Sequence, residues 1–372
     1  MIAIAGLAAA VMAAEGARIP GFVFEDGAYV PEASRSAAGG APATPWRVPF
    51  PPMPGLDANS MTPEKVELGR LLFFDPILSG DNSMACATCH DPKLGLADGR
   101  RKGQGFGGAP LGRHSPTLWN AAYNAHQFWD GRATLLEHQA PFPIQAPDEM
   151  NQDPDELVDE LLAIPEYVAR FDRVFGCGQD AITFDNVAKA VAAFERTLLS
   201  FSAPFDRFAA GDADALTAQQ QQGFELFRSK RLRCIECHPL PTFTDTRFRV
   251  IGVPEDDVPD PGRAKVPGEG PFGAFKVSTL RNVAVTAPYM HNGHFDTLDA
   301  IIDFYADGAG LANDPPAENI DPIIRPFRIT NEEKAAVIAF LHALTDTSLQ
   351  PSRPERVPSG LVATAPPSVP IE

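Results

Sequence analysis

The chain has 372 residues, 44% of them apolar, and a formal net charge of −17 at pH 7. This length predicts about two domains of ordinary globular composition. A surface this acidic repels nucleic acid and favours a basic protein partner, which excludes nucleic-acid binding as a function. No segment approaches the ~20 consecutive apolar residues that a membrane-spanning helix needs, so no transmembrane segment is expected.

The two ends of the chain differ in composition from its centre. Residues 1–14 are apolar and small, and Val11-Met12-Ala13 before Ala14 resembles a signal-peptide cleavage site. The usual preceding basic residues are missing, which indicates a signal peptide with a truncated start; a buried helix start is the alternative. Residues 15–60 are predicted to be an N-terminal arm or linker, and residues 347–372 a loosely ordered Pro-rich tail.

Four of the five cysteines lie in two Cys-x-x-Cys-His motifs. In this motif both thiols bind haem vinyl groups and the histidine ligates the iron, so two covalently bound c-type haems are predicted. The cofactor-binding residues are Cys86, Cys89, His90, Cys234, Cys237 and His238. Two other readings of these motifs fit less well. A zinc ribbon needs its cysteine pairs about 15–20 residues apart, and these are much farther apart; a thioredoxin-like pair needs no histidine after it. Because haem c is attached outside the cytoplasm, we expect export to a Gram-negative periplasm. Cys177 is expected to be a buried free thiol.

A weak internal repeat surrounds the two motifs. Thr62 is predicted to cap a helix before the first motif, and Thr217 to begin a capping box before the second. An amphipathic helix follows each motif, the second one starting with a capping box at Thr330. Their apolar faces consist of Val187, Val191, Phe194 and Leu198, and of Val337, Phe340, Leu341 and Leu344. This order predicts a mainly α fold with little β structure. It has two tandem cytochrome c-like domains, residues 61–210 and 211–346, with one haem each.

A run of further motifs resembles the bacterial di-haem cytochrome c peroxidases, a family that includes MauG. The motifs are residues 68–75 (LGRLLFFD), 86–92 (CATCHDP), 128–133 (FWDGRA), 280–282 (LRN) and 286–293 (TAPYMHNG). The resemblance spans roughly residues 63 to 345, and the order of its motifs is specific. It implies a peroxide site at the N-terminal haem, in the domain of residues 61–210. It also implies an electron-transfer role for the C-terminal haem.

The resemblance assigns catalytic roles to four residues between the haem motifs. Trp129 matches a tryptophan that relays electrons between the two haems; alone, it would read as a core aromatic. Gln139, Pro143 and Glu149 follow at the family's spacing for the peroxide pocket. Glu149 is the candidate acid/base, because cleavage of peroxide needs a group that moves a proton between its two oxygens. Outside this context Glu149 would read as a surface acid, and Gln139 is expected to orient the peroxide.

One departure from the family concerns the resting state of the N-terminal haem. In the classical peroxidases a loop histidine caps this haem and must leave before peroxide binds. The position that aligns with it is Phe106, in a Gly-rich stretch, and a phenyl ring cannot ligate iron. The N-terminal haem is therefore predicted to be five-coordinate and open. His114 is the alternative ligand.

A second departure concerns the C-terminal haem. The peroxidases use a methionine as its sixth ligand, and the corresponding position is Tyr305, in a helix that Thr297 is expected to begin. Tyrosine here is the MauG-like arrangement. A phenolate is hard and anionic and favours oxidised iron, whereas methionine raises the haem potential. The alternatives are a packed core tyrosine, or ligation by Met290, His291 or His294.

The resemblance also implies a calcium ion between the domains. The family holds it through an asparagine and two backbone carbonyls, which match those of Thr286 and Pro288. His114 stands at the asparagine position, and imidazole is a poor ligand for a cation that prefers oxygen. The calcium site is therefore an open expectation, to which the carbonyl of His114 could contribute.

Three functions compete. The first is a peroxidase that reduces hydrogen peroxide with electrons from a small periplasmic cytochrome c or cupredoxin. The second is a MauG-like enzyme, in which peroxide oxidises both haems and these oxidise aromatic residues of a partner protein. The third, a plain electron carrier, is disfavoured by the predicted open haem beneath Gln139 and Glu149. A homodimer remains open, because the classical peroxidases are often dimers.

Overall fold

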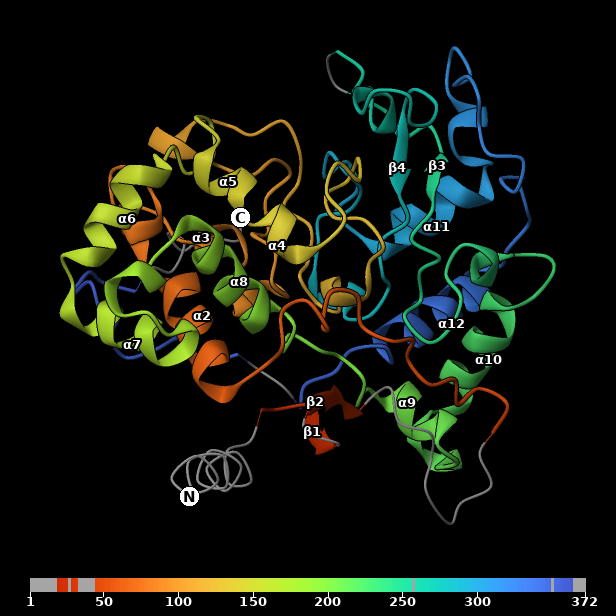
Figure 1. Ribbon diagram of the computed structural model, residues 1–372. Coiled ribbons are helices and arrows are strands. Elements are labelled where there is room, and N and C mark those ends of the chain that lie inside the picture. Colours follow the sequence, from red (N-terminus) through yellow and green to blue (C-terminus); the bar gives the residue numbers. More distant parts are fainter. Residues whose placement is uncertain (1–18, 26–27, 33–43, 256–257, 349–350, 364–372) are drawn as a thin grey trace.

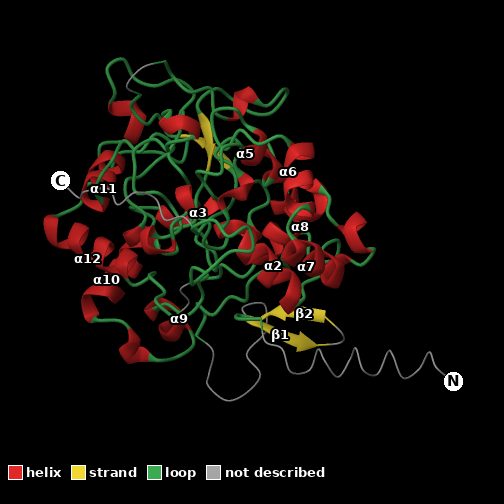
Figure 2. Cartoon of the chain, turned by 90° about the vertical axis from the view of Figure 1, so that its left-hand side faces the viewer, coloured by secondary structure: helices red, strands yellow, loops and turns green. Residues whose placement is uncertain are grey.

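The computed structural model describes residues 19–25, 28–32, 44–255, 258–348 and 351–363, and in this part of the chain the fold is mainly helical (Figure 1). The helices of residues 63–195 gather on one side of the molecule, and those of residues 204–342 on the other (Figure 2). Long loops meet between them. The expected mainly α fold is confirmed, and none of the described helices is long and apolar enough to cross a membrane.

The first side contains seven α-helices. They are α2 (Pro63–Phe74), α3 (Cys86–Cys89), α4 (Leu136–Gln139), α5 (Pro141–Gln145), α6 (Pro154–Leu162), α7 (Pro165–Phe175) and α8 (Phe184–Glu195). Helix α2 starts where the sequence predicts, because the Thr62 side chain accepts a hydrogen bond from the Lys65 amide at 3.1 Å. Helices α2 and α8 pack closely at Gly69, where an added Cβ would lie 1.8 Å from the carbonyl oxygen of Ala190.

The second side repeats this helix pair. Its helices are α9 (Pro204–Ala209), α10 (Ala218–Phe227), α11 (Leu298–Ala306) and α12 (Asn331–His342). Helix α10 crosses α12 at Gly223, where an added Cβ would lie 1.9 Å from the carbonyl oxygen of Ala336. Phe227 and Phe340 pack across this pair with ring centroids 5.1 Å apart, as Phe73 and Phe194 do across the first pair.

The described β structure consists of two antiparallel hairpins. Strand β1 (Phe22–Glu25) pairs with β2 (Ala28–Pro31), and β3 (Phe248–Val250) pairs with β4 (Ala274–Lys276). Short 3-10 helices punctuate the loops. They are Pro76–Leu78, Pro92–Leu94, Phe106–Gly108, Ala121–Tyr123, Gly178–Ala181, Ala213–Ala215, Cys234–Glu236, Arg263–Lys265, Val283–Val285 and Ala309–Ala312.

Charged side chains join the loops between the two sides. The guanidinium of Arg113 donates to Asp130 at 2.8 Å and to both carboxylate oxygens of Asp260, at 2.6 and 2.8 Å. Arg263 donates to the backbone carbonyls of Asp130 and Gly131. Both aspartates have a pKa below their usual range despite their burial: Arg132 and then Arg113 lower that of Asp130, and Arg113 lowers that of Asp260. These contacts fix the loops that carry the candidate site.

Two local expectations are wrong. Residues 351–363 of the expected loose tail pack against the first side: Val357 is buried, and the Ser359 hydroxyl donates to Asp75 at 2.6 Å. Cys177 is exposed rather than buried, at a turn with a left-handed backbone conformation. The predicted signal peptide, residues 1–14, lies outside the described residues.

Candidate functional site

Both Cys-x-x-Cys-His motifs form one short helical turn. The first is helix α3 and the second is the 3-10 helix Cys234–Glu236. The amide of His90 donates to the carbonyl of Cys86, and that of His238 to the carbonyl of Cys234, both at 3.0 Å. The two motifs therefore place both thiols and the imidazole in the same relation, as the sequence repeat predicts.

The two imidazoles are held by matching backbone contacts. Nδ1 of His90 lies 3.0 Å from the carbonyl oxygen of Leu96, and Nδ1 of His238 lies 2.9 Å from that of Phe243. A carbonyl only accepts, so Nδ1 carries the proton and Nε2 keeps its lone pair for a metal. Burial also lowers the pKa of both histidines, which favours the neutral form that ligates iron.

The thiols do not resemble a zinc site. Each motif offers two thiols and one imidazole, one donor fewer than the four that a structural zinc site uses. Within the described ranges, no cluster of three or more His, Cys, Asp or Glu side chains could hold a metal ion. Each motif instead pairs two thiols with one imidazole, the set of groups that fits a haem c.

The two motifs open into separate cavities. His238, Cys234 and Cys237 line a cavity of about 250 Å³. Cys86, Cys89 and His90 line one of about 60 Å³, and a neighbouring cavity of about 260 Å³ also includes Cys89. The small cavity is where the structure brings together the residues expected for peroxide chemistry, namely Gln139, Pro143 and Glu149.

Comparison with known proteins identifies the group to which this arrangement belongs. A family model described as di-haem cytochrome c peroxidase matches residues 63–214. The methylamine utilization protein MauG of Methylorubrum extorquens is 42% identical over 303 residues, which cover 81% of this chain and 82% of that protein. The chain belongs to the di-haem cytochrome c peroxidase and MauG family.

Two further relatives represent both branches of the family. Cytochrome-c peroxidase IdrP1 of Denitromonas iodatirespirans is 37% identical, over 84% of this chain and 89% of that protein. The crystal structure of a MauG-like protein associated with microbial copper homeostasis matches with a TM-score of 0.75 and 30% identity. That match covers 86% of this chain and all of the other.

The cavity that contains His90 is formed where α4 and α5 meet. Gln139 ends α4, Pro143 lies in α5, and Glu149 lies in the turn that follows. The Gly-rich loop packs directly on this turn, since a Cβ on Gly105 would lie 1.7 Å from the carbonyl oxygen of Asp148. Burial raises the pKa of Glu149, Asp148 raises it further and Arg132 opposes both, which suits a group that must both accept and donate a proton.

Neither side chain considered as a cap of the N-terminal haem lines the His90 cavity. Phe106 begins a 3-10 helix in the Gly-rich loop, and it is Gly105 that reaches the cavity wall. His114 lines the other cavity, the one that contains His238, and its Nδ1 lies 2.7 Å from the carbonyl oxygen of Arg100. The open N-terminal haem remains a prediction.

Trp129 lies where the loops of the two sides meet. Its indole Nε1 donates to the carbonyl of His114 at 2.8 Å, and its own carbonyl accepts from the amide of Lys276 at 2.8 Å. Its ring lies 6.4 Å from that of His291, and it lines the His238 cavity. This position between the two sides is compatible with the predicted relay, which remains a prediction.

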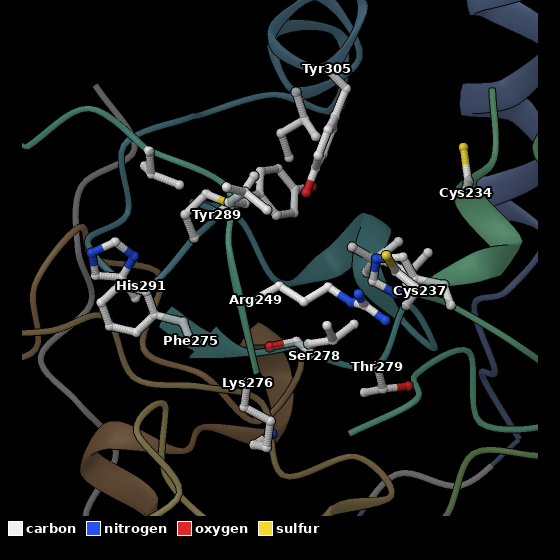
Figure 3. A pocket seen from close by; sticks show the side chains of 18 of the residues that line it. Cys234, Cys237, Arg249, Phe275, Lys276, Ser278, Thr279, Tyr289, His291 and Tyr305 are labelled. Carbon is white, nitrogen blue, oxygen red and sulfur yellow. The ribbon is translucent and has the colours of Figure 1, made fainter. Parts of the chain in front are cut away.

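Tyr305 occupies the last turn of α11 and lines the same cavity as His238. Figure 3 shows its hydroxyl pointing into this cavity, on the side where Cys237 lies. Helix α11 begins at the expected cap, because the Thr297 side chain accepts from the Ala300 amide. Burial raises the pKa of Tyr305, and Cys237 and Cys234 raise it further.

Two of the three alternative ligands, His291 and His294, are placed less favourably. Nε2 of His291 lies 2.6 Å from a carboxylate oxygen of Glu255, and its ring stacks on Phe275 with a centroid separation of 3.6 Å. Met290 lines the cavity, whereas His294 is not among the residues that line it. Tyr305 directs its hydroxyl into this cavity, which Met290 also lines.

The residues of the expected calcium site come together. His114, Thr286 and Pro288 all line the His238 cavity. The Thr286 hydroxyl donates to the carbonyl of Val283, and the carbonyl of His114 already accepts from Trp129. A carbonyl oxygen has a second lone pair, so the hydrogen bond leaves it able to contact a cation.

Three charged residues that line the cavities were not predicted from the sequence. Arg249 lines the His238 cavity and points towards Cys237 in Figure 3. Its guanidinium donates hydrogen bonds to the carboxylates of Asp245, at 2.5 Å, and Asp321, at 2.7 Å. Lys276 lines the same cavity, and burial lowers its pKa to about 8. Glu195 lines the His90 cavity. The sequence contains one indication of this position: Glu195 lies four residues after Val191, and residues four apart share a face of a helix, here the apolar face of α8.

Proposed function

We propose that this chain is an exported di-haem c-type enzyme that reduces hydrogen peroxide at the His90 haem, with electrons relayed through the His238 haem. Each haem is bound by addition of two cysteine thiols across its vinyl groups, one in each of two cytochrome c-like domains. The observation that carries this proposal is the meeting of Gln139, Pro143 and Glu149 with His90 in one cavity. Relatives named as cytochrome-c peroxidases support it.

The chain's own residues have distinct tasks in this reaction. A haem held by Cys86, Cys89 and His90 would supply the electrons that break the oxygen–oxygen bond. Gln139 orients peroxide by hydrogen bonding, and Glu149 takes the proton from the near oxygen and returns it to the far one, which leaves as water. Pro143 narrows the cavity and donates no hydrogen bond, since it has no amide hydrogen. The complete reaction consumes two electrons and two protons for each peroxide and yields two waters.

A second function, MauG-like oxidation of aromatic residues in a partner protein, is favoured by Tyr305. Its hydroxyl points into the His238 cavity, where the peroxidases of the family place a methionine. A phenolate ligand stabilises oxidised iron, so this haem would store oxidising equivalents better than it would accept electrons from a donor of high potential. The relatives named MauG support this second function as strongly as the relatives named peroxidases support the first.

Two measurements on the holoenzyme separate the functions. Hydrogen peroxide added to the diferric protein should change the spectra of both haems in either case; slow bleaching alone would contradict both. Steady-state oxidation of a reduced small c-type cytochrome should then be fast for a donor-fed peroxidase and slow for a MauG-like enzyme. Mass spectrometry of the denatured protein should find two covalently attached haems.

The remaining features of the proposal have simple tests. Calcium held by the carbonyls of Thr286, Pro288 and His114 predicts that chelation changes the spectrum of the holoenzyme and that added calcium restores it.

Periplasmic export predicts that the protein is recovered in the osmotic-shock fraction of the native host. A homodimer predicts twice the monomer mass in light scattering.

A further inference from the structure

A second carboxyl group, Glu195, lies in the peroxide pocket with Glu149. It is the last residue of α8 and lines the cavity that also contains His90 and Gln139. The residue is only 4% exposed, and its buried Oε2 has no hydrogen-bond partner among the described residues. An unpaired carboxyl oxygen costs free energy when buried, so its retention at a cavity wall indicates that it serves a ligand there.

The nearby charges do not neutralise this group. Arg196, the next residue, donates to both carboxylate oxygens of Glu137 on α4, at 2.5 and 3.0 Å. Glu137 also accepts from Asn59, whose amide oxygen accepts from the Lys65 ammonium of α2 at 3.0 Å. The Arg196 guanidinium is thus paired with Glu137, although its buried Nε has no partner among the described residues, and Glu195 forms no ion pair with it.

The result is a carboxyl group that keeps its proton at neutral pH. Burial, opposed by Arg196 and aided by Glu137, raises the pKa of Glu195 to about 8. The other titratable groups at the cavity are Glu149, Cys86 and Cys89, whose pKa values are also raised, and His90, whose pKa is lowered. Glu195 is one of the charges that raise the pKa of Cys86. A neutral carboxylic acid carries an O–H that can be donated.

We propose that Glu195 is a second proton donor of the peroxide pocket, acting after Glu149. The proposal rests on the proposed peroxide reaction. The first water leaves with the two protons of peroxide, which Glu149 moves. The second oxygen leaves as water only after two electrons and two further protons arrive. Glu195 supplies one of these protons: its O–H bond breaks, an O–H bond of the product water forms, and the carboxylate is reprotonated from solvent.

A route for that reprotonation adjoins the pocket. The neighbouring cavity of about 260 Å³ is walled in part by Asp81, Asp98 and Arg100, and it shares Met84 and Cys89 with the peroxide pocket. Polar walls of this kind accommodate water, which bridges protein groups by hydrogen bonds. The proton donor is required whether the electrons come from a donor protein or from aromatic residues of a substrate protein.

The first test is spectroscopic and needs no turnover. Infrared spectra of the diferric holoenzyme at pH 6 should contain a protonated carboxyl band that shifts in D2O. This band should vanish in Glu195→Gln and titrate near pH 8. Glu160→Gln is the matched control, because Glu160 also has a raised pKa but lies on α6 outside the pocket. A spectrum in which Glu195→Gln removes no such band would overturn the proposal.

The second test separates the two steps of the reaction. Glu195→Gln should leave the initial spectral change with peroxide within about twofold and slow the return to the resting state by about 100-fold or more. Glu149→Gln should slow the initial change. Glu195→Asp retains an acid and should recover part of the lost rate. An unaltered return rate in Glu195→Gln would refute proton donation, whereas a wild-type protein inert to peroxide would refute the proposed function and leave the infrared result standing.

Discussion

Trp129 donates its indole Nε1–H to the carbonyl oxygen of His114 at 2.8 Å. The amide of His114 in turn donates to the carbonyl of His291 at 2.8 Å. This chain of contacts ties the predicted relay residue to the wall of the His238 cavity. It also fixes the orientation of the indole ring, on which electron transfer between two haems depends.

The first prediction concerns this relay. Trp129→Phe should leave haem content unchanged and slow donor-fed peroxide turnover by about 10- to 100-fold, because the indole and its hydrogen bond are lost between the haems. Stopped-flow reduction of the two haems measures the effect. Trp119→Phe is the control, since Trp119 is buried in the hydrophobic core of the first side and lines neither the His90 cavity nor the His238 cavity. Equal effects of the two substitutions would contradict a relay at Trp129.

The second prediction concerns the ligand of the C-terminal haem. Tyr305→Met should raise the potential of that haem on the order of 100 mV or more, since thioether sulfur favours reduced iron and phenolate favours oxidised iron. Spectroelectrochemical titration measures it. Tyr289→Phe is the matched control, because Tyr289 is also a buried tyrosine at this cavity. An unchanged potential in Tyr305→Met would remove Tyr305 from the coordination sphere.

The third prediction concerns a buried ion pair. Arg281 is 1% exposed and donates to both carboxylate oxygens of Asp206, at 2.8 and 2.9 Å, and to the carbonyl of Pro241. Arg281→Met should lower the free energy of unfolding by about 3–5 kcal/mol, because the Asp206 carboxylate is left without its cation. Arg231→Met breaks an exposed pair with Glu333 and should cost less than about 1 kcal/mol. Urea denaturation of the holoenzyme compares the two.

The fourth prediction is a pH dependence that follows from Glu195. In the unfolded chain this carboxyl ionises near its ordinary pKa, but in the folded protein it keeps its proton up to about pH 8. The unfolded state therefore binds fewer protons between these values, and stability falls as pH rises through this window. Wild type should lose on the order of 3–5 kcal/mol relative to Glu195→Gln between pH 4.5 and pH 8. Parallel unfolding curves at every pH would contradict the prediction.

Local relations were readable from the sequence. The caps at Thr62, Thr217 and Thr330 form as predicted, because each side chain accepts from an amide only three residues away. The docking of the tail was not readable, since the hydrogen bond from Ser359 to Asp75 joins residues 284 positions apart. A sequence of Pro and Ser resembles a loose segment until its partner surface is known.

The same limit applies to the cavities. The family motifs led to Gln139, Pro143 and Glu149, which the fold brings together at His90. Glu195 was missed because a charged residue at the end of an amphipathic helix usually faces solvent. Its burial depends on how α8 packs against the rest of the pocket, and that packing is a property of the folded chain.

The fifth prediction tests the duplicated helix pair. Gly69 in α2 and Gly223 in α10 each pack against a carbonyl oxygen of the partner helix, α8 or α12. An added Cβ would lie 1.8 Å from the oxygen of Ala190 and 1.9 Å from that of Ala336. Gly69→Ala and Gly223→Ala should each destabilise the fold by about 1–3 kcal/mol or more, because the helices must separate to admit the methyl group. Gly112→Ala is the control, since nothing lies within 4 Å of a Cβ there, and it should stay within about 0.5 kcal/mol of wild type. Thermal unfolding monitored at a haem band measures all three. If only one of the two helix-pair variants were destabilised, the two crossings would not be equivalent, and the structural duplication would not extend to the energetics of the two sides.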